Sequence, residues 1–274
     1  MKLGVRAHDY GRHKAGELAK LLKAEGFEAA QVALHKAIEG IPAPYPIEDE
    51  KLQEVKDAFE KAQIDISVLG CYMNLSTDDP KEKADHTRNL KAGISYAKML
   101  NAGMIGTETS YGVLPMEAKK ETRKQVWDMI SGLLPLAEEK GVILGIEPVA
   151  AHTLYSPQWT KELIQDMKSP NLKIIFDPVN LLTKNRIQDQ EELWRECFEA
   201  FGEEIQAVHL KDCVLDDQGN FAPCPLGTGL MKYDYLFSWL KKNKGQISVM
   251  REEIAMESAH QDILFMKTLL NGET

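Results

Sequence analysis

The chain has 274 residues, of which 43% are hydrophobic, and its formal net charge is -9. No stretch approaches the roughly 18 consecutive apolar residues of a membrane span, and the acidic charge opposes nucleic-acid binding, which needs Lys and Arg to neutralise phosphates. The first residues turn polar too early for a signal peptide, and the four cysteines form no CxxC pair, so we expect a cytoplasmic protein with free thiols and neither a membrane nor a nucleic-acid partner.

Short runs rich in Val and Ile alternate with longer segments of helical period along the whole chain. Such alternation is typical of repeated βαβ units that build a parallel sheet. Strands are predicted at residues 2–7, 29–34, 65–71, 102–107, 142–147, 173–177, 206–210 and 246–251. Helices are predicted at residues 16–25, 48–62, 80–100, 117–140, 159–167, 191–201, 233–242 and 259–270.

Eight repeats predict a single α/β domain over residues 1–274, a (β/α)8 TIM barrel, because barrels of this kind routinely reach this length. A doubly wound open sheet would show the same alternation and is the alternative. That fold usually carries a glycine-rich phosphate turn, whereas the GTG at residues 227–229 lacks the third glycine of a dinucleotide fingerprint.

Ionisable residues stand at the ends of the last four predicted strands. Glu147 ends the fifth strand, Asp177 ends the sixth, and His209 lies near the end of the seventh. After the eighth strand either Glu252 or Glu253 can reach inward, and the two-residue period of a strand favours Glu252. Since the C-terminal strand ends of a barrel surround one open mouth, we expect these side chains to meet there.

Three carboxylates and one imidazole around a common point would repel one another, and a bound cation resolves that arrangement. Carboxylate oxygens suit Mg²⁺, Mn²⁺ or Co²⁺, and one imidazole shifts the preference toward Mn²⁺, Co²⁺ or Zn²⁺. We therefore predict a divalent-metal site with Mn²⁺ as the first choice. Glu147 taken alone would more often be a solvated loop residue, so the prediction depends on the combination Glu147, Asp177, His209 and Glu252.

These strand ends resemble the sugar phosphate isomerase and epimerase family of xylose isomerase-like TIM barrels. The likeness rests on GIEP at residues 145–148, FDPVN at residues 176–180 and VHLKD at residues 208–212. The resemblance implies a divalent ion held by two glutamates, an aspartate and a histidine, with Glu147 and Glu252 also exchanging the substrate proton. Asn180 stands where many members have a histidine, and residues 214–216 lack the arginine of many ketose epimerases, so the substrate stays open.

Several polar residues near the same mouth are candidates for substrate binding. Lys211 shares a strand face with His209 and could hold a substrate oxygen or phosphate, or pair with Asp212 or Glu147 at the rim. The remaining candidates end or follow other strands and could line the pocket or only form its polar rim: Asn74, Glu108, His152 and Asn180.

The function predicted from these residues is a metal-dependent isomerase or epimerase of a small sugar, ketose or polyol derivative. Its chemistry would be carboxylate proton transfer through a metal-stabilised enediolate. A lyase such as a keto-polyol dehydratase would use the same centre, and a non-catalytic carbohydrate-binding barrel would keep the pocket without the ion. An apurinic endonuclease would need more histidines and a basic DNA face, which the chain lacks. The partner is a small carbohydrate, and a homo-oligomer is left open.

Overall fold

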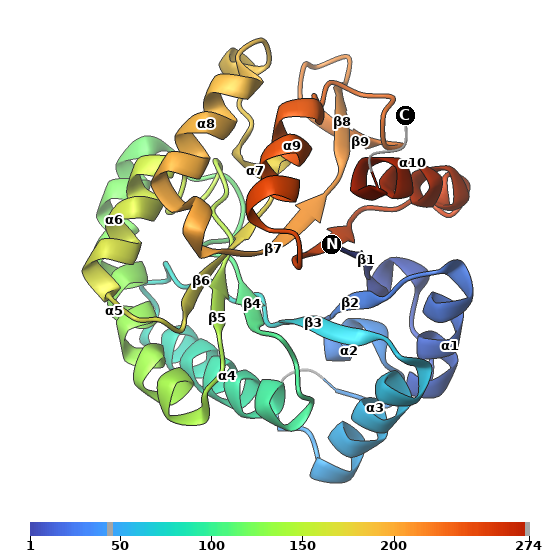
Figure 1. The fold of residues 1–274 in the computed structure, drawn as a ribbon. Coiled ribbons are helices and arrows are strands. Elements are labelled where there is room, and N and C mark those ends of the chain that lie inside the picture. The colour runs from blue at the N-terminus through green and yellow to red at the C-terminus, as the bar shows by residue number, and fades with distance from the viewer. Residues whose placement is uncertain (43–45, 272–274) are drawn as a thin grey trace.

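The computed structural model describes residues 1–42 and 46–271. Within them, eight parallel strands close into a barrel in the order β1-β10-β7-β6-β5-β4-β3-β2 (Figure 1). The bounds are β1 (Lys2–Arg6), β2 (Ala29–Val32), β3 (Asp65–Gly70), β4 (Ile105–Thr107), β5 (Leu144–Ile146), β6 (Leu172–Phe176), β7 (Ile205–Leu210) and β10 (Ser248–Arg251). β1 pairs in parallel with both β2 and β10, so the (β/α)8 prediction is confirmed and the open sheet is wrong.

Helices surround the strands and form the outer ring in Figure 1. The long ones are α1 (Ala15–Glu25), α3 (Asp49–Ala62), α4 (Pro80–Met99), α5 (Met116–Lys140), α6 (Pro157–Met167), α8 (Gln190–Phe201), α9 (Asp234–Asn243) and α10 (Ala259–Asn271). Short turns add α2 (Leu34–Ala37), α7 (Pro178–Leu181) and the 3-10 segments η1 (Ala7–Tyr10), η2 (Lys184–Arg186) and η3 (Gly202–Glu204). None of the helices built by residues 1–42 and 46–271 is long and apolar enough to cross a bilayer.

Helix ends follow local sequence signals. The Asp79 side chain accepts hydrogen bonds from the backbone N–H groups of Lys81 and Glu82 at the start of α4, where Pro80 is the first helical residue. α1 and α5 end at Gly26 and Gly141, which have φ of 94° and 63° and so adopt the left-handed conformation that glycine tolerates. These signals explain why the predicted and observed helix bounds agree closely.

A hairpin outside the barrel, β8 (Asp212–Leu215) and β9 (Phe221–Cys224), was not predicted. The buried Asp212 carboxylate anchors it by accepting hydrogen bonds from the backbone N–H groups of Cys213, Gly227, Gly229 and Met231, at 2.8 to 3.1 Å. A Cβ on Gly229 would collide with the Asp212 carboxylate. The GTG turn therefore serves close packing of this loop.

An apolar layer fills the barrel interior. We call it the plug, and its members are Val68, Met104, Ile175, Ala207 and Met250, each at most 2% exposed. Glycines on neighbouring strands make room for it: a Cβ on Gly145 would lie 2.6 Å from Met104 Sδ, and one on Gly106 would lie 2.6 Å from Val68 Cγ1. The plug lies directly beneath the polar residues of the mouth, inside the barrel.

Candidate metal centre

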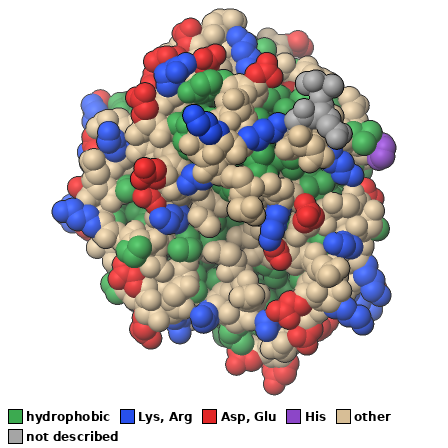
Figure 2. Space-filling view, in the orientation of Figure 1, with side chains coloured by type: hydrophobic (Ala, Val, Ile, Leu, Met, Phe, Trp, Pro, Cys, Tyr) green, Lys and Arg blue, Asp and Glu red, His purple; other side chains and the backbone are tan. Residues whose placement is uncertain are grey.

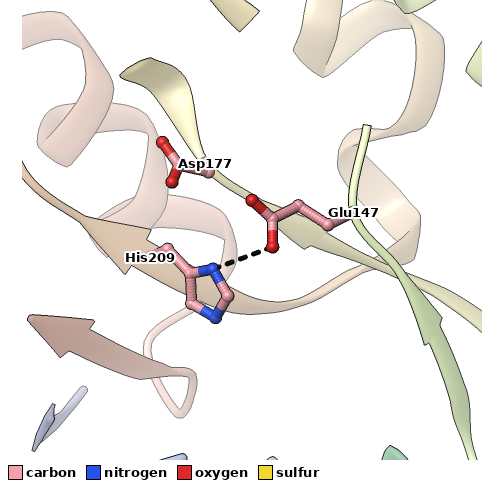
Figure 3. A group of neighbouring side chains, drawn as sticks. All are labelled: Glu147, Asp177 and His209. Atoms are coloured by element: carbon pink, nitrogen blue, oxygen red, sulfur yellow. Dashed lines mark ion pairs between the residues drawn. The ribbon is translucent and has the colours of Figure 1, made fainter. Parts of the chain in front are cut away.

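Glu147, Asp177 and His209 point toward one another at the C-terminal mouth of the barrel (Figure 3). Glu147 directly follows β5, Asp177 directly follows β6, and His209 lies on β7. Each offers a ligand atom, and the three atoms lie within 4.8 Å of one another. All three residues are at most 1% exposed. Residues predicted from three separate strand ends thus form one cluster, while their role as ligands stays a prediction.

His209 is fully buried between carboxylates. Its Nδ1 lies 3.1 Å from Glu147 Oε2 and 3.4 Å from Glu252 Oε1, yet neither ring nitrogen has a hydrogen-bond partner among the described residues. Burial lowers the pKa of His209, but Glu252 and Glu147 outweigh it and raise the pKa to about 9. In the protein alone, a proton on His209 compensates carboxylates that a cation would otherwise neutralise.

Glu252, directly after β10, is 4% exposed and faces the same point. Its Oε1 accepts a hydrogen bond from Gln31 Nε2 at 3.0 Å, and its Oε2 lies 3.6 Å from Arg6 Nη1. Burial raises the pKa of Glu252, but His209, Lys211 and Arg6 together lower it to about 2. The carboxylate is therefore ionised and oriented.

Glu253 differs from its neighbour. It has a φ of 56°, and its side chain is 37% exposed, with Oε1 3.7 Å from Lys211 Nζ. The left-handed backbone at Glu253 turns the chain away directly after Glu252. Of the two glutamates, Glu252 is thus the one that approaches His209, which supports the choice made from strand period without testing it as a ligand.

Lys211 is buried and reaches into the carboxylates. Its Nζ lies 3.0 Å from Asp177 Oδ2 and 3.9 Å from Glu252 Oε2, so its partner at the mouth is Asp177 rather than Asp212 or Glu147. Burial alone would lower the pKa of Lys211, but the surrounding carboxylates, Asp177 foremost, raise it above its usual range. Burial raises the pKa of Asp177 to about 6 against the opposing charge of Lys211.

Asn180, in α7, connects two members of the cluster. Its Nδ2 donates to Glu147 Oε1 at 2.5 Å, and its backbone N–H donates to Asp177 Oδ1 at 3.0 Å. Asp177 is also the N-cap of α7. The residue that takes the place of the expected histidine therefore fixes both carboxylates.

The other substrate-binding candidates divide into two groups. Glu108 and His152 form a pair, with Glu108 Oε2 3.4 Å from His152 Nδ1, and burial followed by the charge of Glu147 raises the pKa of Glu108 to about 8. Asn74 has other partners: its Oδ1 accepts hydrogen bonds from the backbone N–H and the hydroxyl of Ser76. Its backbone carbonyl contacts His86 Nδ1 at 2.8 Å.

The donor set fits a divalent cation. Glu147, Asp177 and His209 can each supply one ligand atom. Glu252, whose Oε1 lies 3.4 Å from the same His209 Nδ1 that Glu147 approaches, is the candidate for a fourth. Nδ1 has carboxylates beside it, whereas Nε2 of this fully buried ring has no hydrogen-bond partner among the described residues, which is costly unless a ligand satisfies it. Carboxylates and one imidazole are the ligands that Mn²⁺, Co²⁺ and Zn²⁺ accept.

Fold and site together define a (β/α)8 barrel with a candidate divalent-metal centre at its mouth. The sequence model of the family described as Xylose isomerase-like TIM barrel matches residues 19–269. The chain belongs to this family, and the resemblance seen in the strand-end motifs is confirmed. A comparison with curated proteins found no match.

Three solved structures show how widely this barrel is shared. A D-psicose 3-epimerase determined in the presence of D-fructose has 16% identity and a TM-score of 0.75, covering 99% of this chain and 100% of its own. The IOLI protein with a bound zinc atom has 17% identity and a TM-score of 0.76, covering 100% and 99%. A probable 3-DHS dehydratase from Bacillus anthracis has 16% identity and a TM-score of 0.71, covering 98% of each chain. At these identities the likeness shows the fold.

Two residues around Glu252 are more important than their sequence positions indicate. Gln31 is the last residue but one of β2 and Arg6 is the last residue of β1, and from the sequence both could line the pocket or only form its polar rim. Their contacts with Glu252 depend on the closure of the barrel, which brings β1 beside β10. The signal that could have found them is the same as for the ligands, a polar residue at a strand end.

Proposed function

We propose that this protein is a divalent-metal-dependent isomerase or epimerase of a small sugar, ketose or polyol derivative. The observation that supports it best is the convergence of Glu147, Asp177 and His209, with the carboxylate of Glu252 on the same imidazole nitrogen. Membership in the Xylose isomerase-like TIM barrel family supports an enzyme of this kind. Mn²⁺ as the preferred ion, a cytoplasmic location and a single domain over residues 1–274 belong to the same proposal.

A bound cation would polarise the substrate carbonyl and stabilise the charge of an enediolate. In this proposal Glu147 and Glu252 carry the proton transfers, which is supported by the approach of both carboxylates to His209 Nδ1, at 3.1 and 3.4 Å. One removes the proton from the carbon beside the carbonyl, and the other returns it. Return to the opposite face of that carbon is epimerisation, and return to the neighbouring carbon interconverts aldose and ketose.

The polar neighbours hold the substrate in this proposal. Lys211 donates to a substrate oxygen near Asp177, and Asn180 keeps Glu147 oriented. The pair of Glu108 and His152 binds hydroxyls on the side of β4. Asn74 acts from the loop after β3, where Ser76 orients its side chain.

One observation favours a dehydratase as the second candidate. Glu108 is a partly buried carboxyl whose pKa is raised to about 8 by burial and by the charge of Glu147, which favours its protonated form at neutral pH. A protonated carboxyl near an enediolate can donate that proton to a leaving hydroxyl, which turns proton abstraction into loss of water. The sequence of steps up to that point is the same as for epimerisation.

The test is a reaction in D2O after metal analysis. The purified protein is reconstituted with Mn²⁺ and incubated with ketohexoses, ketopentoses and keto-polyols, and exchange at the carbon beside the carbonyl is followed by NMR. Exchange with a new diastereomer supports the epimerase, and exchange with loss of water supports the dehydratase. Absence of both, in a protein that binds sugar but no stoichiometric ion, would leave a non-catalytic carbohydrate-binding barrel.

A further inference from the structure

A cavity of about 550 Å³ lies beside the candidate metal centre, between the loop after β5, α7 and the β8–β9 hairpin. Cavities of about 300 to 1,000 Å³ are the size that takes drug-sized ligands, so this one has room for more than a single monosaccharide. The residues that the argument uses are Val113, Val149, Val179, Asn180, Lys211 and Phe221.

The inner end of the cavity is continuous with the centre. Asn180 and Lys211 line it, and the same two side chains contact Glu147 and Asp177. A ligand whose oxygens reach the centre can therefore extend into this cavity. Thr183, Lys184 and Asn220 add polar groups elsewhere in the lining.

Part of the cavity wall is apolar. Val149, Val179 and Phe221 line it, and so does Val113, which is 84% exposed. Each sugar hydroxyl is both a hydrogen-bond donor and an acceptor. Burying it against such a wall costs free energy unless it finds a hydrogen-bond partner there. An aliphatic or aromatic group binds favourably to the same wall, because its apolar surface is removed from water.

We propose that this cavity binds an apolar substituent of the substrate, and that the substrate is a glycoside-like sugar derivative that carries a keto group and bears an aryl or alkyl group. The sugar oxygens then lie at the centre and the substituent packs against Phe221 and the valines. This inference rests on the proposed function for the placement of the sugar part. The hairpin that forms one wall is the element that the sequence pattern did not predict.

The experiment compares paired probes on the Mn²⁺-loaded protein. Calorimetry measures the binding of phenyl and methyl β-glycosides of glucose, galactose and xylose. We expect the phenyl member to bind about tenfold tighter in at least one pair, since the ring buries apolar surface. Phe221→Ala removes that preference, whereas Val214→Ala, on the same hairpin but outside the cavity lining, keeps it. Val113→Asp, at a site too exposed to affect folding, also weakens the phenyl member.

The outcomes separate this inference from the proposed function. Equal binding within every pair, or binding of neither member, overturns the inference, and so does a dimer that Phe221→Ala dissociates, because the apolar wall would then be an interface. A phenyl preference in a protein that shows no metal-dependent exchange supports the cavity and removes the enzyme proposal. Metal-dependent exchange of free ketoses with no phenyl preference supports the enzyme proposal and overturns the inference about the cavity.

Discussion

The plug and the candidate metal centre occupy the same strands one step apart, yet their chemistry is opposite. On β6, β7 and β10 the inward-facing residue changes within two positions, from Ile175 to Asp177, from Ala207 to His209 and from Met250 to Glu252. A two-residue step keeps the side chain on the same face of a strand. The apolar layer directly beneath the charges keeps water away from them, and burial alone would make both groups neutral. The opposite charges packed around His209 and Glu252 outweigh burial, which raises the pKa of His209 and lowers that of Glu252.

The largest effect is expected from the centre. Glu147→Gln keeps the shape of the side chain but cannot accept a proton at neutral pH, so turnover should fall by about 10²- to 10⁴-fold. Circular dichroism should remain that of the wild type. The matched control is Glu117→Gln in the first turn of α5, whose side chain is 79% exposed, and its turnover should change little. Full activity in Glu147→Gln would remove this carboxylate from the chemistry.

The next effect separates His209 from the other buried histidine of the mouth. At a Mn²⁺ concentration a hundredfold above its Kd, the ion should stabilise the wild type by about 2.7 kcal/mol, which raises Tm by roughly 5–10 °C for a chain of this size. His209→Ala should lose this shift. His152→Ala, whose ring pairs with Glu108, should retain it, and equal shifts in the two variants would show that His209 is no ligand.

The plug can be broken without touching a charge. In Gly145→Ala the new methyl would lie 2.6 Å from Met104 Sδ and 3.2 Å from Ile175 Cδ1, and such overpacking costs about 1–3 kcal/mol. Urea unfolding measures the loss. The control is Gly132→Ala in α5, where a Cβ meets nothing within 4 Å, and where helix propensity should stabilise by up to about 1 kcal/mol. A stability of Gly145→Ala equal to the wild type would show that the plug has spare volume.

The smallest effect is expected from Gln31, which supports Glu252 at the edge of the candidate metal centre. Gln31→Ala removes the hydrogen bond to Glu252 Oε1, and loss of such a supporting contact lowers metal affinity or activity by about tenfold. Gln190→Ala is the matched control, because this equally buried glutamine donates to the backbone of Ile187 and Leu230 far from the centre. It should reduce stability and leave Mn²⁺ affinity unchanged, and the same pattern in Gln31→Ala would assign Gln31 a purely structural role.

Much of the fold could be predicted because the hydrophobic periods of strands and helices are local features of the sequence. Strand and helix ranges follow from residue spacing, and the convergence of Glu147, Asp177 and His209 follows from the order of strands in a closed barrel. The hairpin could not be predicted, because β8 and β9 have 4 residues each and Pro223 interrupts the second. Their pairing depends on Asp212 and distant backbone N–H groups.

The pairing of charged residues within the mouth also could not be predicted from the sequence. Lys211 follows a strand and precedes Asp212, so its neighbours along the chain say nothing about Asp177, which it contacts across the barrel. Which of several carboxylates a long flexible side chain meets is decided by packing and burial. The acidic and basic side chains that intersperse on the face shown in Figure 2 are, by contrast, the solvated mixture that composition alone leads one to expect.

The pairing of β1 with β10 has a consequence for how the protein is made. Among the barrel strands β1 leaves the ribosome first and β10 last, so one edge of β1 finds its partner only after the other barrel strands have been synthesised. At about 5–20 residues per second this interval is on the order of tens of seconds. During that time the sheet has two open edges, which are templates for pairing with other chains. The nascent protein is therefore most exposed to aggregation before its final strand emerges, and a chaperone that shields those edges would act at that stage.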